Sequence, residues 1–69
     1  MKLSARNVLP GKIIEITTGA VNVEVIIEIA PGVEVASIIT KQACDTLQLK
    51  KGMSAYAAIK ASNVMIAVE

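Results

Sequence analysis

The chain has 69 residues, of which 54% are hydrophobic and 19% are charged, and its formal net charge is +1. This length allows one domain over residues 1–69, and so thin a core usually needs a disulfide, a metal or partner subunits to stabilise it. The composition excludes an internal disulfide and a Cys/His zinc site, because Cys44 is the only cysteine and there is no histidine, which leaves partner subunits.

The apolar runs are rich in Val and Ile and predict strands. Residues 12–17 belong to the first strand. Strict alternation of apolar residues predicts a second strand over 21–29, and 33–39 continues it, so these two form a hairpin around Pro31-Gly32. Further strands are expected over 53–60 and 64–68. We interpret Pro10-Gly11, Thr18-Gly19 and Lys51-Gly52 as further turns between the runs.

One segment, 40–47, lacks the alternation. Its Ala43 and Leu47 are four residues apart, on one face of a helix, and Thr40 suits the N-cap position. We therefore expect a short helix between the third and fourth strands. Three strands, a helix and two strands is the order of the OB fold, so the prediction is an all-β, five-stranded OB-fold-like barrel with one short helix.

The predicted strands carry bulky apolar residues on both faces. Ile13-Ile14 and Ile38-Ile39 place an aliphatic side chain on each side of the sheet, and Ile26 lies between glutamates on the outer face. A lone small barrel normally presents a more polar exterior. The excess indicates buried subunit contacts, and a large aliphatic core is the alternative.

No catalytic constellation is visible. The carboxylates are scattered along the chain, Cys44 has no histidine to activate it and suits a small helix-packing residue, and the glycines form no phosphate-binding loop. Tyr56 is the only aromatic residue, which with the +1 charge argues against a nucleic-acid binder. No apolar run approaches the ~20 residues of a membrane span and no secretory signal is visible, so we expect a cytoplasmic protein that is not an enzyme.

Hydrogen-bond donors gather at the ends of the predicted strands. Ser4-Ala5-Arg6-Asn7 precedes the first strand, Lys60-Ala61-Ser62-Asn63 separates the last two, and Thr40 lies at the strand–helix junction. Each taken alone has an ordinary explanation: the first segment as a solvated strand edge, Lys60 as a surface charge and Thr40 as a helix cap. Together they offer donors and no carboxylate, which suits a small, fully ionised oxyanion that can only accept hydrogen bonds.

Longer stretches resemble one family over essentially the whole chain. The opening Ser4-Ala5-Arg6-Asn7 with Leu9-Pro10-Gly11-Lys12-Ile13 is similar to that of the molybdate-binding molbindins (Mop/TOBE domains), as are the following stretches: Val23-Glu24-Val25, Ser37-Ile38-Ile39-Thr40 and Lys60-Ala61-Ser62-Asn63-Val64-Met65-Ile66. The resemblance implies an OB-type barrel that exchanges strands in dimers. It also implies a homohexamer, a trimer of dimers, that holds oxyanions at its subunit interfaces.

When the family's ligand positions are transferred to this sequence, the resemblance implies an oxyanion-binding site in which a metal is present only as part of the oxyanion. The implied side-chain ligands are Ser4, Arg6, Thr40 and Lys60, and the implied backbone or hydroxyl donors are Ala5, Ala61 and Ser62. Some relatives have a hydroxyl where this chain has Ala43, so only the Ala43 backbone N–H could serve there. A second kind of site near the threefold axis is implied without assigned residues.

The resulting prediction is an intracellular protein that binds molybdate or tungstate for molybdenum storage and homeostasis. Two alternatives stay open at this point. One is an OB-fold module that interacts with nucleic acid or protein, and the other is a subunit that delivers the anion to a transporter or to cofactor synthesis.

Overall fold

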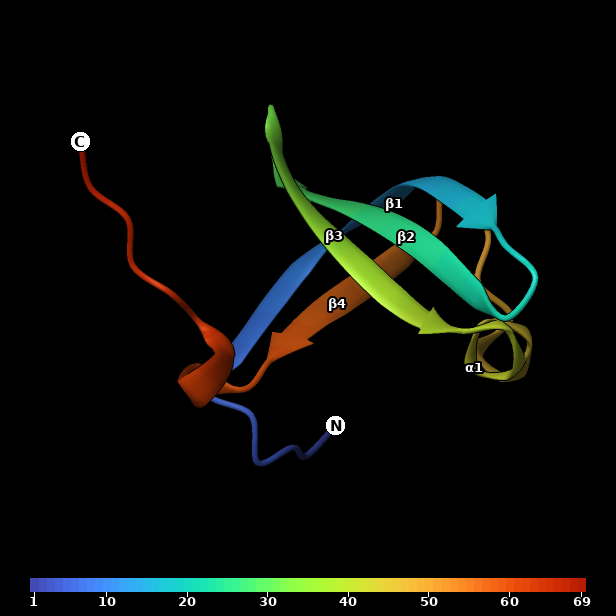
Figure 1. Cartoon of the computed structure of the whole chain (residues 1–69), viewed down its shortest axis with the longest axis horizontal. Coiled ribbons are helices and arrows are strands. Elements are labelled where there is room, and N and C mark those ends of the chain that lie inside the picture. Colours follow the sequence, from blue (N-terminus) through green and yellow to red (C-terminus); the bar gives the residue numbers. More distant parts are fainter.

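The computed structural model describes all 69 residues and is built around one curled antiparallel sheet (Figure 1). Its elements, in chain order, are β1 (Asn7–Thr18), β2 (Asn22–Ala30), β3 (Val33–Thr40), α1 (Lys41–Leu47), β4 (Ser54–Ile59) and the 3₁₀ turn η1 (Ala61–Asn63). The strand order across the sheet is β3-β2-β1-β4, so β3 and β4 are its two edges. A mostly-β chain with one short helix is therefore as predicted. None of its helices is of the length and apolar character needed to span a bilayer.

The predicted fifth strand over 64–68 is absent from the single chain. After η1 the C-terminal segment leaves the sheet and extends away from it (Figure 1), and every residue from 64 to 69 is exposed. An alternating apolar segment becomes a strand only where an edge pairs with its N–H and C=O groups, and this segment reaches neither edge of its own sheet.

The long strand β1 holds the sheet together, because it pairs with β2 along one side and with β4 along the other. The prediction of a turn at Pro10-Gly11 is wrong: both residues lie within β1, opposite Tyr56 and Ala55 of β4. Gly11 is there for space, since a Cβ atom on it would lie 2.6 Å from the Glu28 carbonyl oxygen and 2.7 Å from Ile27 Cγ2. The glycine lets β2 cross β1 closely, and an irregularity between Ile13 and Glu15 adds to the bend.

The hairpin of β2 and β3 forms as the alternation predicts. It turns at Pro31-Gly32, where Gly32 has a φ of 76°, and its ladder runs from Ala30 opposite Val33 to Asn22 opposite Thr40. Within β2, Val23, Val25 and Ile27 are buried while the alternate positions face outward. The period of two thus decides which face of the strand meets the core.

The predicted helix also forms with the predicted cap. Thr40 is the N-cap of α1, and its Oγ1 accepts a hydrogen bond of 3.0 Å from the Ala43 N–H. The helix ends at Gln48, whose left-handed φ of 54° turns the chain. Cys44 packs against the core from this helix, consistent with its predicted structural role.

The core is small. Only five of the 69 residues are buried, namely Ile13, Val23, Val25, Ile27 and Ala57. Large apolar side chains remain exposed on the sheet, the helix and the C-terminal segment, among them Ile38, Leu47, Tyr56 and Ile66. One chain therefore leaves large apolar side chains exposed, in keeping with the bulky residues expected on both faces of the predicted strands.

Candidate oxyanion site

The first donor segment, Ser4-Ala5-Arg6, lies just before β1 begins at Asn7. Ser4 and Arg6 are exposed and Ala5 is half-buried. None of the three belongs to a helix or strand. The next residue, Asn7, is bonded to the end of β4: its side-chain Nδ2 donates a hydrogen bond of 3.2 Å to the carbonyl oxygen of Ile59.

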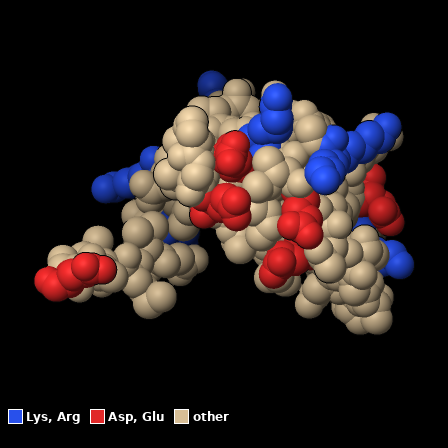
Figure 2. Space-filling view, turned by 90° about the horizontal axis from the view of Figure 1, so that it is seen from above, with Lys and Arg blue, Asp and Glu red and all other residues tan.

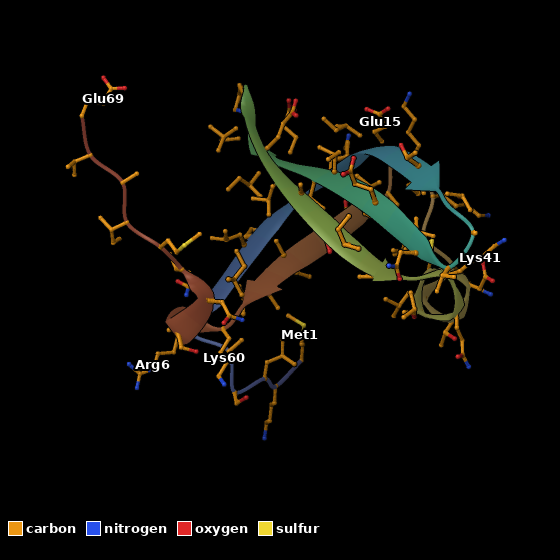
Figure 3. The ribbon with its side chains drawn as sticks, in the orientation of Figure 1. Met1, Arg6, Glu15, Lys41, Lys60 and Glu69 are labelled. Carbon is orange, nitrogen blue, oxygen red and sulfur yellow. The ribbon has the colours of Figure 1, made fainter.

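The second donor segment, Lys60-Ala61-Ser62, begins where β4 ends. Because β1 and β4 are antiparallel and Asn7 lies opposite Ile59, the end of β4 meets the start of β1. The residues after Ile59 turn at once into η1, where the Asn63 N–H donates to the Lys60 carbonyl at 2.9 Å. Figure 3 shows Arg6 and Lys60 at this same end of the molecule. The sheet thus brings together two segments that are more than fifty residues apart in the sequence.

The third donor, Thr40, lies at the opposite end of the sheet with Ala43. Thr40 is the last residue of β3 and pairs with Asn22, next to the turn in which the Lys41 N–H donates to the Val21 carbonyl at 2.9 Å. Figure 3 shows Lys41, the first residue of α1, far from Arg6 and Lys60. Almost the whole length of β1 separates the two ends, at a rise of about 3.3 Å per residue. One chain therefore does not bring all the predicted site residues together.

The hydrogen bond of the N-cap decides what Thr40 and Ala43 can offer. The Ala43 N–H already donates to Thr40 Oγ1. An incoming oxyanion would have to share that N–H with the hydroxyl oxygen, whereas the hydroxyl proton of Thr40 is free to donate. Thr40 is consequently the stronger of the two predicted donors at this end of the chain.

Negative charge is kept away from the paired donor segments. No Asp or Glu occurs in residues 1–14 or 46–68. Figure 2 shows acidic side chains with lysine or arginine side chains between them, and the acidic residues of the sheet lie in β1, β2 and β3: Glu15, Glu24, Glu28 and Glu34. The structure contains no group of three His, Cys, Asp or Glu side chains that could hold a metal ion. The Arg6–Lys60 end of the molecule thus offers two cations, two serine hydroxyls and backbone N–H groups, and suits an anion.

Asn7 is the residue of this region that the sequence reasoning left out of the predicted site. It stood in the first donor segment, but the resemblance gave it no role. The signal was its place at the boundary between that segment and the first strand, where an amide can bond to a neighbouring backbone.

The curled antiparallel sheet with one capped helix, and with donor-rich segments at its ends, defines a small OB-like binding domain. The chain belongs to the TOBE domain family, whose model matches residues 3–66. It is 46% identical over 69 residues to the probable molybdenum-pterin-binding protein of Haemophilus influenzae, and the match covers the full length of both chains.

Solved structures agree on the fold. MopII from Clostridium pasteurianum superposes with a TM-score of 0.90 at 39% identity, over 97% of this chain and 100% of that one. The cytoplasmic molybdate-binding protein ModG, in a form with molybdate bound, gives a TM-score of 0.88 at 52% identity, over 94% of this chain and 46% of that one. The predicted family and OB-like fold are confirmed.

Proposed function

We propose that this protein binds molybdate, or the similar tungstate, without catalysing a reaction on it, and that it serves as an intracellular store or buffer of the anion. The observation that supports the proposal is that the β1–β4 ladder brings the segment with Ser4 and Arg6 next to the segment with Lys60 and Ser62, with no Asp or Glu nearby in the sequence. The relatives named for molybdenum-pterin or molybdate binding support the choice of anion.

The chemistry of the donors fits a tetrahedral dianion. Arg6 and Lys60 offset its two negative charges, while the Ser4 and Ser62 hydroxyls and backbone N–H groups bond to its oxygens. A site rich in donors and without a carboxylate disfavours an anion that still carries a proton, such as hydrogen phosphate, because its O–H would find only hydroxyl oxygens as acceptors. Sulfate has the same charge and shape as molybdate but is smaller, so cavity size must reject it.

The complete site takes its donors from two chains. Arg6 and Lys60 lie at one end of a subunit and Thr40 lies at the other, so the Arg6–Lys60 end of one subunit has to meet the Thr40 end of a neighbour. This arrangement places the anion at an interface, and the two cations of one chain are then joined by the Thr40 hydroxyl and, less strongly, the Ala43 N–H of the next.

The assembly itself is a homohexamer made of three strand-exchanged dimers. The concave face between β3 and β4 contains an apolar groove of about 320 Å³, lined mainly by Ile13, Ile27, Ile39, Leu49 and Met53. Residues 64–68 form an exposed apolar segment with no partner in their own chain. Inserted between β3 and β4 of a second copy, this segment supplies the missing fifth strand, pairs the two open edges and covers the groove.

Native mass spectrometry of the anion-free protein tests the binding and the assembly together. We expect a hexamer that gains mass in steps of one molybdate and does not gain sulfate under the same conditions. A monomer that binds no molybdate contradicts the storage function and leaves an OB-fold interaction module as the remaining function.

The sharing of the site between chains is tested by mixing two defective variants. Thr40→Val and Lys60→Ala chains each form only incomplete sites by themselves. When the two are unfolded and refolded together, random pairing regenerates about a quarter of the sites with both native halves. A matched mixture of two tagged Lys60→Ala chains regenerates none. If the first mixture binds no more molybdate than the second, the site does not combine these residues from two chains.

A further inference from the structure

The side chain of Asn7 ties together the two donor segments at the Arg6–Lys60 end. Its amide Nδ2 donates to the Ile59 carbonyl at 3.2 Å, and the residue is half-buried. Arg6 immediately precedes the donor of this bond and Lys60 immediately follows its acceptor. The bond therefore joins the first residue of β1, next to one cation, to the last residue of β4, next to the other.

Little else in the chain fixes the two segments to each other. The structure contains only two hydrogen bonds that involve a side chain, and the second is the helix cap at the far end. Residues 1–6 lie outside every helix and strand, and no backbone hydrogen bond outside those elements involves them. The Lys60 side is held by bonds within η1, which order that turn but do not reach the N-terminal segment. Asn7 also forms the last pair of the β1–β4 ladder, where strand ends fray most easily.

We propose that Asn7 is a positioning residue for anion binding, which holds Arg6 and Lys60 at the spacing that the anion requires. The inference rests on the proposed function of this end of the molecule. Without an anion, the two cations repel each other and favour opening of the last β1–β4 pair. The Asn7–Ile59 bond opposes that opening, so the site is partly organised before the anion arrives, and less of the binding free energy is used to order it.

The first test compares the anion affinity of two variants by isothermal titration calorimetry with molybdate. Asn7→Leu keeps the branching at Cγ but has no donor, and we expect about three- to tenfold weaker binding, the net effect of one hydrogen bond. Asn7→Gln keeps an amide donor on a longer side chain and should recover part of that loss. The matched control is Thr17→Val, which removes a hydroxyl at an exposed position of β1 outside the predicted site and should bind as the parent does.

A double-mutant cycle distinguishes positioning from a general loss of stability. In a Lys60→Ala background one of the two cations is already gone, so adding Asn7→Leu should change the affinity less than about twofold. In a Thr17→Val background, at an exposed position of β1 outside the predicted site, it should keep its full effect. The same variants are checked by native mass spectrometry and urea unfolding, in which we expect the parent's oligomeric state.

The outcomes separate the two proposals. If the parent chain binds no molybdate, the proposed function fails and the role of Asn7 fails with it. If the parent binds and Asn7→Leu binds equally well, only the positioning role is overturned. Equal losses in the Lys60→Ala and Thr17→Val backgrounds also overturn it, because they identify Asn7 as a residue that supports the fold in general.

Discussion

The close approach of β2 to β1 at Gly11 yields a sharp prediction about the stability of the barrel. In Gly11→Ala the new Cβ atom would lie 2.7 Å from Ile27 Cγ2, whereas carbon atoms in contact are about 3.5–4.0 Å apart. It would also lie 2.6 Å from the Glu28 carbonyl oxygen, which is backbone and cannot rotate away. Ile27 is itself in the core, so β2 has to move away from β1 by roughly 1 Å.

Overpacking of this kind costs about 1–3 kcal/mol, and the contact with backbone places Gly11→Ala at the upper end of that range. Alanine recovers up to ~1 kcal/mol by restricting the unfolded chain. We therefore expect a net loss of about 2 kcal/mol in the free energy of unfolding. In thermal unfolding this corresponds to a lower Tm by roughly 10 °C, measured at one fixed protein concentration because assembly adds to the stability.

The matched control is Gly32→Ala in the β2–β3 turn. There the added Cβ meets no atom within 4 Å, and only the φ of 76° is unfavourable, at about 1–2 kcal/mol. A Gly11→Ala protein within about 0.5 kcal/mol of the parent would refute the reasoning, since the two strands would then have room for a methyl group.

Three further predictions concern the site and the assembly. Lys60→Ala removes a charge-assisted hydrogen bond worth about 1.5–3 kcal/mol, so molybdate affinity measured by calorimetry should fall tenfold or more while urea unfolding without anion stays unchanged; equal affinity would exclude Lys60 as a ligand. Thr40→Ala removes the cap of α1 and should lower the free energy of unfolding by about 1 kcal/mol even without anion, whereas Thr40→Ser should keep most of it. Removal of residues 64–69 should reduce the number of chains per particle measured by light scattering, because the groove between β3 and β4 loses its proposed occupant. An unchanged number of chains would contradict strand exchange.

Much of the fold could be predicted because it depends on local patterns. The alternation of Val23, Val25 and Ile27 determines which face of β2 is buried, and the turn at Pro31-Gly32 pairs it with β3. The helix was visible from the break in that alternation and from Thr40 as a cap, since both signals act within a few residues. The turn predicted at Pro10-Gly11 was wrong because the glycine is required there by a non-local contact, the close approach of β2 to β1.

The sequence by itself determined the chemistry of this protein: aliphatic strands, a small aliphatic core, and donor segments at Arg6, Thr40 and Lys60 without carboxylates. Only the tertiary structure decided which donors meet. The antiparallel β1–β4 ladder brings Arg6 beside Lys60, and the β2–β3 ladder carries Thr40 to the far end. It also left residues 64–68 without a partner. The physical reason is that residue type and spacing specify hydrogen-bonding capacity and local conformation, whereas distances between remote segments follow from strand register, which only the assembled sheet defines.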